Sequence, residues 1–253
     1  MRSPLKVTKR DFRSLSALKE LIPADSIVHS FLMFEGAMEF GLAAADRYVV
    51  AHTNKYVCYE FWWCVQSDPK RIATAVEYFQ PIEDKNVFYL LQENWPSYSD
   101  PYVRAALFLL LNRYSATGKI SSGEFNSEAY RPTDIVQLQN LGFRNLHILL
   151  DKEEDFVDSL SSIHGRCDYV FVPVGAYTLN VFENEKQGYE DTYVCHKSLK
   201  KVFEETENNM VLLYEASKAI VDLYKDYKMV FVDKYGRKVP QSELASEVLI
   251  ANF

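Results

Sequence analysis

CDYVFVPVGAY, residues 167–177, is a short apolar run followed by residues that interrupt regular structure. Residues 169–172 are all β-branched or aromatic, which is typical of a strand buried on both faces of a parallel sheet. Pro173 and Gly175 predict that the strand ends after residue 172. In open α/β sheets the loop leaving such a strand binds ligands. Apart from Tyr177, this loop contains no acid, base or nucleophile.

The rest of the chain extends this pattern into alternating strands and helices. Short β-branched and aromatic runs predict further strands at 26–31, 47–52, 145–149, 210–214, 228–233 and 247–253. Helical spacing predicts helices at 11–22, 35–45, 55–65, 70–80, 101–113, 190–206 and 216–225, and polar residues with two glycines predict a loop or hairpin at 115–132. We therefore expect an α/β sheet with helices on both faces, in one domain spanning 1–253 with an inserted helical and hairpin subdomain at 65–135.

Composition limits the classes of function. The 253 residues are 48% hydrophobic, enough for a substantial core, and the net charge of −7 argues against a broad cationic surface for nucleic acid. The four cysteines form no CxxC pair, so neither a structural zinc site nor a disulfide framework is indicated. No apolar stretch approaches the roughly 18 residues that span a bilayer. The sequence predicts a soluble, intracellular protein.

Several segments, in order, resemble the Dam-type DNA adenine methyltransferases. ALFLLLNRYSATGKISSGEFN (106–126) is similar to that family's apolar helix, "LNR" ending, glycine turn and "GxFN" hairpin. The other matching segments are SPLKV (3–7), SIVHSF (26–31), DYVFVPVGAY (168–177), HKSL (196–199) and EVLIANF (247–253). The resemblance spans nearly the whole chain and implies a Rossmann-like methyltransferase sheet with an inserted recognition subdomain.

The residues that carry catalysis in that family do not match. Its members transfer a methyl group from S-adenosylmethionine to a flipped-out adenine, whose amine is held by a "DPPY" loop. Here the corresponding positions are Val172, Pro173, Val174 and Gly175, and Tyr177 is the aromatic displaced by one or two positions. The resemblance therefore implies a degenerate loop that lacks the acid needed to hold the amine.

The cofactor positions differ in the same way. The family's first strand ends in an acid and a glycine-rich turn, whereas HSFLMFEGA keeps Phe31 but has His29 at the acid and Met33 and Phe34 in the turn. The ribose-binding acid of the second strand is replaced by His52, and the opening "GGK" loop is VTKR at 7–10. Bulky side chains in place of glycines predict a filled cofactor site, so we expect no bound cofactor.

His29 and His52 are expected to be neighbours at adjacent strand ends. Two neighbouring histidines are compatible with a metal site or with acid–base chemistry. The favoured interpretation is that they fill a vacated pocket, because neither a third ligand nor an orienting carboxylate is evident. The acids considered near these strand ends are Glu35, Asp46 and Asp168, and Asp168 precedes its strand. No metal site is predicted.

The hairpin supplies the predicted macromolecule-binding residues, which are Asn112, Arg113, Lys119, Phe125 and Asn126. We expect Phe125 to tuck under the hairpin while Arg113 and Lys119 stay accessible. The alternative is structural: Asn112 ends the helix and Arg113 pairs with a local acid.

The sequence as a whole predicts a catalytically inactive protein with the DNA adenine methyltransferase fold, retained as a structural or macromolecule-binding subunit. Its acidic charge and aromatic content favour a protein partner or a larger assembly, with DNA as a second class of partner and no membrane. The resemblance, rather than any residue, implies a virus, phage or mobile element as the source, with a virion-associated protein as one form. The alternative function is an active S-adenosylmethionine-dependent DNA adenine methyltransferase with divergent motifs, for which S-adenosylmethionine is the cofactor.

Overall fold

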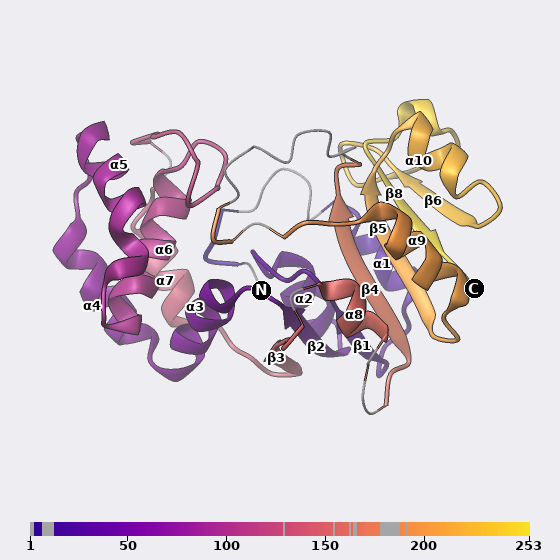
Figure 1. The fold of residues 1–253 in the computed structure, drawn as a ribbon, viewed down its shortest axis with the longest axis horizontal. Helices are drawn as coiled ribbons and strands as arrows, with labels where there is room; N and C mark the ends of the chain where they lie inside the picture. Colours follow the sequence, from indigo (N-terminus) through magenta and orange to yellow (C-terminus); the bar gives the residue numbers. More distant parts are fainter. Residues whose placement is uncertain are drawn as a thin grey trace. The chain divides into compact units, whose positions relative to one another are not determined.

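A computed structural model describes residues 3–6, 13–128, 130–153, 155–161, 163, 166–177, 188–190 and 192–253 (Figure 1). The opening loop predicted at 7–10 lies outside the described residues. The chain divides into two compact units. Unit 1 comprises Met1–Thr8, Lys55–Phe143 and Lys186–Asp191, and unit 2 comprises Lys9–Asn54, Arg144–Glu185 and Thr192–Phe253.

The insertion is longer than predicted. It was expected at 65–135, but its main segment begins at Lys55 and ends at Phe143. The reason is that the helix starting at Tyr56 belongs to the core of unit 1, where the rings of Phe61 and Phe108 stack with centroids 4.8 Å apart.

Unit 2 is built on one eight-stranded sheet. Its strands are β1 (Ile27–Ser30), β2 (Tyr48–Thr53), β3 (Leu146–Leu150), β4 (Tyr169–Gly175), β5 (Asn209–Glu215), β6 (Lys228–Val232), β7 (Lys238–Val239) and β8 (Glu247–Ala251). The order across the sheet is β3-β2-β1-β4-β5-β8-β6-β7. Strands β1 to β5 pair in parallel, and β8 pairs antiparallel with both β5 and β6.

This topology confirms the predicted fold class. The order 3-2-1-4-5 for the parallel strands is that of a doubly wound α/β sheet. The antiparallel β8 between β5 and β6 gives the Rossmann-like methyltransferase sheet that the resemblance implies. The carboxyl ends of β1 to β5 lie along one edge, where ligands bind in such folds.

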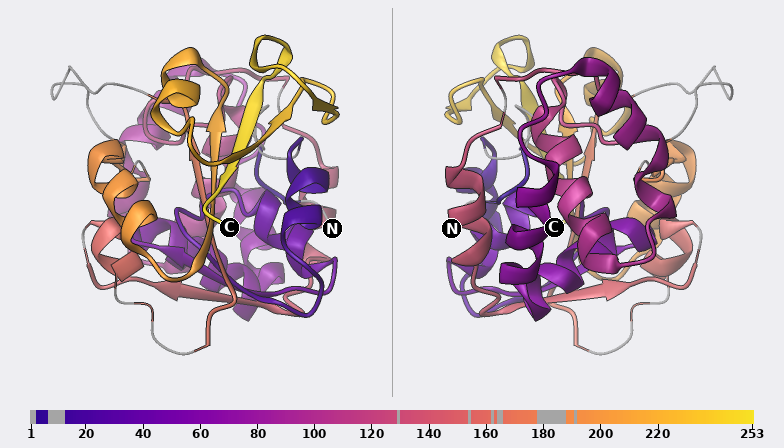
Figure 2. Two further views of the ribbon diagram at one scale, coloured as in Figure 1. Left: turned by 90° about the vertical axis from the view of Figure 1, so that its right-hand side faces the viewer. Right: turned by 90° about the vertical axis from the view of Figure 1, so that its left-hand side faces the viewer.

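Helices cover both faces of the sheet (Figures 1 and 2). On one face α8 (Phe156–Ser161), α9 (His196–Glu205) and α10 (Lys218–Leu223) share a buried core with Val170, Leu212 and Ile250 of β4, β5 and β8. On the other face lie α1 (Leu15–Leu21) and α2 (Ala37–Ala43). These two helices pack closely because Gly41 lacks a Cβ, which would lie 2.4 Å from Cδ2 of Leu15.

Strand β4 continues beyond the predicted end at residue 172. It runs to Gly175, with an irregular register against β5 between Pro173 and Gly175. Proline is tolerated because β1 pairs with β4 only at residues 169–171, so the missing N–H of Pro173 deprives no partner on that side. Gly175 has a φ of 79°, which glycine adopts without strain.

Unit 1 is helical. It contains α3 (Tyr56–Ser67), α4 (Pro69–Phe79), α5 (Lys85–Asn94), the 3-10 turn η1 (Trp95–Ser97), α6 (Pro101–Tyr114) and α7 (Thr133–Gln139); the second 3-10 turn, η2 (Ser242–Leu244), belongs to unit 2. Three of the helices are capped by an aspartate that accepts from a backbone N–H, namely Asp68, Asp84 and Asp100. The sequence interpretation did not include α5, α7, α8 or β7.

Candidate functional site

The candidate site is the edge of unit 2 where the parallel strands end. Phe31, just after β1, packs in the core shared with α8 and α9. Because side chains alternate between the two faces of a strand, His29 lies on the same face as Phe31. Val50 of β2 is the register partner of His29, so His52 lies on the same face, two residues nearer the carboxyl end. The predicted contact between the two histidines therefore follows from the register.

The two imidazoles and an aspartate form a hydrogen-bonded row. His29 Nδ1 lies 3.0 Å from His52 Nε2, and His52 Nδ1 lies 2.8 Å from Oδ1 of Asp151. Asp151 is the first residue after β3, and its backbone N–H donates to the carbonyl of Thr53 at the end of β2. We call Asp151, His52 and His29 the histidine row.

Asp151 corrects the expectation that no carboxylate orients the histidines. The acids considered from sequence were Glu35, Asp46 and Asp168. Asp168 does lie at the amino end of the sheet, where its carboxylate accepts from the N–H of Ile27 at 2.9 Å. The sequence does place an acid, Asp151, directly after the apolar run LHILL. That Asp151 lies beside His52 follows only from the pairing of β3 with β2, which was not predicted from the sequence.

The end of the row nearest the strand termini is packed by neighbouring side chains. The Phe31 ring stacks on His52 with centroids 4.2 Å apart and planes 9° from parallel. The N–H of Met33 donates to the carbonyl of His52 at 2.9 Å, which joins the loop after β1 to β2. His29 and His52 are 5% and 7% exposed, so this edge is filled by protein atoms.

The turn after β1 contains two residues with positive φ, of which one is a glycine. Leu32 has a φ of 61° and Gly36 a φ of 72°, both in the left-handed region. Met33 is buried, and its Cε lies 2.9 Å from where a Cβ on Gly36 would be, while Phe34 is half-buried. A side chain such as leucine is strained at positive φ, and strain of this kind gathers at functional loops.

The loop after β4 carries a second group of rings. Tyr177 lies against His196 at the start of α9, with ring centroids 4.8 Å apart. His196 Nδ1 is 3.1 Å from the hydroxyl of Tyr214 on β5, and burial raises the pKa of Tyr214. Val172 is buried, whereas Pro173, Val174 and Gly175 are half-buried. Among the described residues up to Tyr177, this loop carries no carboxylate.

In unit 1, Asn112 and Arg113, which were predicted to bind a macromolecule, form bonds within the unit. Asn112 is fully buried; its Oδ1 accepts from the N–H of Lys6 at 2.6 Å, and its Nδ2 donates to the carbonyl of Gly118 at 2.7 Å. Arg113 pairs with Asp134 at 2.9 Å and donates to the carbonyl of Pro4. The predicted accessibility of Arg113 is wrong, because only 14% of its side chain is exposed.

The remaining hairpin residues lie nearer the surface. An antiparallel bridge joins Ser115 to Phe125, and the Phe125 ring is half-buried between Phe88 and Tyr114, with centroids 5.3 and 6.0 Å away. Lys119 and Asn126 are exposed. The expected tuck of Phe125 and accessibility of Lys119 are therefore confirmed, while their contact with a macromolecule stays a prediction.

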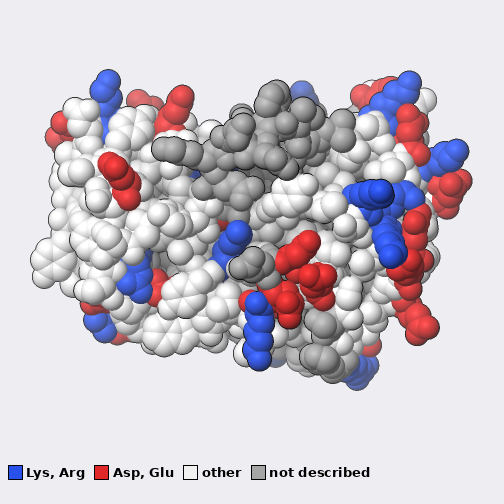
Figure 3. Space-filling view, viewed as in Figure 1, with Lys and Arg blue, Asp and Glu red and all other residues white. Residues whose placement is uncertain are grey.

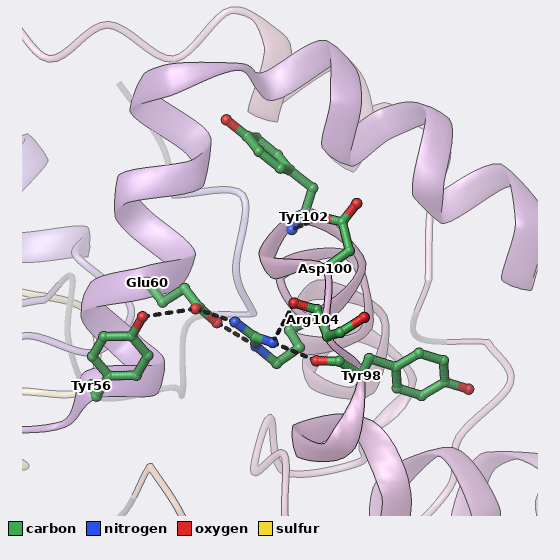
Figure 4. Close-up of polar contacts among 7 residues, drawn as sticks. Tyr56, Glu60, Tyr98, Asp100, Tyr102 and Arg104 are labelled. Atoms are coloured by element: carbon green, nitrogen blue, oxygen red, sulfur yellow. Dashed lines mark hydrogen bonds and ion pairs between the residues drawn. The ribbon is translucent and has the colours of Figure 1, made fainter.

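A second polar cluster of unit 1 joins α3 to α6 (Figure 4). Nε of Arg104 lies 2.7 Å from Oε2 of Glu60 and its Nη2 lies 2.5 Å from Oε1, so the pair is bidentate. Arg104 also donates to the carbonyls of Tyr98 and Ser99, and the exposed Tyr56 hydroxyl donates to Glu60 at 3.0 Å. Glu60 raises the pKa of Tyr56 by accepting this bond. Because Glu60 is buried and Arg104 is largely so, their bidentate pair stabilises the helical unit.

The described residues contain neither a candidate metal-binding cluster of side chains nor a candidate membrane-spanning helix. No group of three or more His, Cys, Asp or Glu side chains there is arranged to hold a metal ion. No helix in the described ranges is both long and apolar enough to cross a bilayer.

Comparisons with known proteins leave the family open. No family model and no curated protein matches the chain. Among solved structures it is similar to SMU.776, assigned as a methyltransferase and complexed with SAH, at 9% identity and a TM-score of 0.42, over 97% of this chain and 50% of that one. It is also similar to the glycopeptide N-methyltransferase MtfA complexed with sinefungin, at 9% identity and a TM-score of 0.40, over 96% of this chain and 86% of that one. The chain thus spans half the length of SMU.776, and the fold assignment rests on the strand order.

Proposed function

We propose that this chain is a methyltransferase-fold protein that does not transfer methyl groups and serves as a binding subunit for another protein. The observation that carries the proposal is the position of His52. Its ring lies at the carboxyl end of β2, stacked on Phe31 and bonded to Asp151, where the family has a free acid for the ribose. Met33 fills the turn that glycines leave open in the family.

The loop after β4 supports the loss of catalysis. An adenine amine needs an acceptor that holds it while it attacks the methyl group. The group beside this loop consists of Tyr177, His196 and Tyr214, and the His196 ring is engaged with the Tyr214 hydroxyl. A tyrosine can stack on a base but cannot replace the carboxylate and main-chain acceptors of "DPPY".

Exposed rings in unit 1 support a protein as the partner. Tyr56, Trp63 and Tyr78 are 58%, 45% and 84% exposed, and Leu90 of α5 is 61% exposed. In the view of Figure 3 the surface of unit 1 is mostly uncharged, with scattered charged groups. Aromatic residues are enriched in protein interfaces, whereas nucleic-acid surfaces are rich in cations. Since Arg113 is paired with Asp134, the hairpin offers less positive charge than the sequence implied.

We expect no thermal stabilisation by S-adenosylmethionine or S-adenosylhomocysteine at millimolar concentration. A ligand present at about 100 times its Kd stabilises the native state by about 2.7 kcal/mol, and each kcal/mol raises the Tm of a chain of this size by about 2–4 °C. Differential scanning calorimetry with and without each ligand measures this shift. An increase of several degrees would show that the edge opens to the cofactor and would overturn the proposal.

The rival function is an active DNA adenine methyltransferase with divergent motifs, and one observation favours it. Leu32 and Gly36 have φ values of 61° and 72° in the turn after β1, and left-handed residues are what the glycine-rich cofactor turn of the family requires. Incorporation of labelled methyl groups from S-adenosylmethionine into adenine-containing DNA tests this rival directly. Incorporation above that of a heat-denatured sample would establish it.

The class of partner is tested by photocrosslinking from a single position. A photoreactive phenylalanine analogue replaces Tyr78 of unit 1 and, as the matched control, Tyr235 of unit 2, which is 69% exposed. We expect protein crosslinks from position 78 but not from 235 in the native source. Binding of labelled duplex DNA that weakens with salt, and is reduced by Lys119→Ala but not by Lys85→Ala, would instead assign DNA as the partner.

A further inference from the structure

The histidine row consists of three ionisable side chains, one from each of three neighbouring strands or the residue directly after it. Its side-chain contacts add to the backbone pairing of these strands. His29 belongs to β1, His52 to β2, and Asp151 follows β3 directly. The two contacts measure 3.0 Å between the imidazoles and 2.8 Å between His52 and Asp151. Each contact depends on where the protons are, and both are shielded from water, since the histidines are at most 7% exposed.

The number of protons in the row decides whether both contacts are hydrogen bonds. An ionised Asp151 carboxylate only accepts, so His52 Nδ1 must carry a proton. His52 Nε2 and His29 Nδ1 face each other, and a bond between them requires a proton on one nitrogen and a lone pair on the other. The two imidazoles can therefore share one positive charge and keep the bond. If both become imidazolium, two N–H groups and two positive charges meet at 3.0 Å.

We propose that the histidine row is a proton-operated latch, which holds the carboxyl ends of β1, β2 and β3 together with at most one positive charge and opens when His29 takes up a second. Opening breaks the contact between His29 and His52. Because His52 also carries the Phe31 stack and its carbonyl accepts from Met33, the turn after β1 loosens with it. Acid thus opens the edge that is filled at neutral pH.

The surroundings of His29 agree with this behaviour. Burial, followed by the charge of His52, lowers the pKa of His29, while a hydrogen bond to the backbone of Arg166 and the charge of Asp151 act in the opposite direction. From the segment before β4, Cys167 is held in its thiol form, because burial raises its pKa to about 11. Asp168 is bonded to the N–H of Ile27, and Glu39 of α2 is bonded to Ser30 on the opposite face. None of these groups replaces His52 as the partner of His29 Nδ1 within the described residues.

The direction of the pH effect follows from the lowered pKa. In the unfolded chain His29 gains its proton near pH 6.5, and in the fold it does so at lower pH. Between these two values the unfolded state binds more protons, so stability is complete above about pH 6.5 and falls as the pH drops below it. One proton of difference changes the unfolding equilibrium constant by up to about tenfold per pH unit.

The test compares His29→Asn with His147→Asn across pH 5.0 to 7.5. The amide oxygen that His29→Asn introduces can accept from His52 Nε2 as Nδ1 of the imidazole does, but it cannot be protonated. His147 lies on the same sheet, in β3, and is exposed, so its removal changes the histidine count without touching the row. Urea unfolding gives the unfolding equilibrium constant at each pH. We expect this constant to rise on acidification in wild type and in His147→Asn by up to about tenfold more per pH unit than in His29→Asn. Equal pH dependence in all three proteins would overturn the latch.

A second measurement needs no variant. Ring nitrogen shifts of ¹⁵N-histidine-labelled wild type follow each imidazole through the titration. We expect the ring nitrogens of His29 to take up a proton only below the ordinary value of about pH 6.5, because burial lowers the pKa of His29. If His29 is protonated at or above that pH in the folded protein, the row is a static contact and the proposal fails.

Discussion

Glu60→Ala is expected to lower the free energy of unfolding of unit 1 by about 3–5 kcal/mol, the usual cost of removing one partner from a buried ion pair. Only 6% of the Glu60 side chain and 19% of the Arg104 side chain are exposed. The variant leaves the guanidinium of Arg104 with the carbonyls of Tyr98 and Ser99 but without a counter-charge. The same carboxylate accepts from Tyr56, so that hydroxyl loses its partner too.

Tryptophan fluorescence measures this effect selectively. The three tryptophans of the chain are Trp62, Trp63 and Trp95, all in unit 1, so their signal reports unfolding of that unit in urea. Arg71→Ala is the matched control, because it breaks the pair of Arg71 with Asp100, whose side chains are 54% and 38% exposed. An exposed pair contributes about 0–1 kcal/mol. If Glu60→Ala costs no more than the control, the cluster does not stabilise the unit.

A double variant separates the ion pair from packing. Glu60→Ala combined with Arg104→Ala removes both charges, so we expect it to be less destabilised than the sum of the two single variants. Additive losses would show that the two side chains stabilise α3 and α6 independently, through their contacts with other groups.

The fold class and the positions of several strands could be predicted from sequence, because the strands are short apolar runs that alternate with helices, whereas the strand order comes from the structure. β1, β2 and β4 each begin within two residues of the predicted position. The end of β4 was missed because proline was expected to stop it, whereas Pro173 lies beyond the part of the strand that β1 pairs with. Whether a proline ends a strand thus depends on neighbours that the local sequence does not specify.

The candidate site could be predicted only in part for a similar reason. The contact of His29 with His52 followed from placing two strands side by side, which the alternation already implied. Asp151 needed a third strand in its correct place, and β3 lies beyond β2 in the sheet although residues 55–143 separate them in sequence. Asp151 also begins an acidic run, DKEED, in which no single carboxylate is distinguished by sequence.

The "LNR" segment shows that a family resemblance can identify residues whose role is structural. Asn112 and Arg113 were predicted to bind a macromolecule, with helix ending and local pairing as the alternative. The observed contacts with Lys6, Gly118 and Asp134 favour the alternative. The residue types alone do not distinguish binding of a macromolecule from bonding within the hairpin, because an amide and a guanidinium bind backbone or carboxylate groups as readily as phosphates.

Asn112→Leu is expected to lower the stability of unit 1 by about 2–6 kcal/mol. Leucine has a similar volume but leaves the N–H of Lys6 and the carbonyl of Gly118 without the bonds that Asn112 provides, and each buried group left unpaired costs about 1–3 kcal/mol. Gly118 has a φ of 83°, so the turn depends on its glycine and on this carbonyl contact. Urea unfolding followed by tryptophan fluorescence gives the loss.

Asn126→Ala is the control for the same hairpin. Asn126 is exposed, and its Oδ1 accepts from the N–H of Glu128, so its removal should cost less than about 1 kcal/mol. Limited proteolysis adds a local readout: cleavage between residues 115 and 128 should be faster in Asn112→Leu than in Asn126→Ala, because only the first variant frees the turn from the helix. If the two variants are equally stable and equally resistant, the hairpin is held by the packing of Phe125 and the bonds of Glu190 to Ile120 and Ser121, and the bonds of Asn112 contribute little to it.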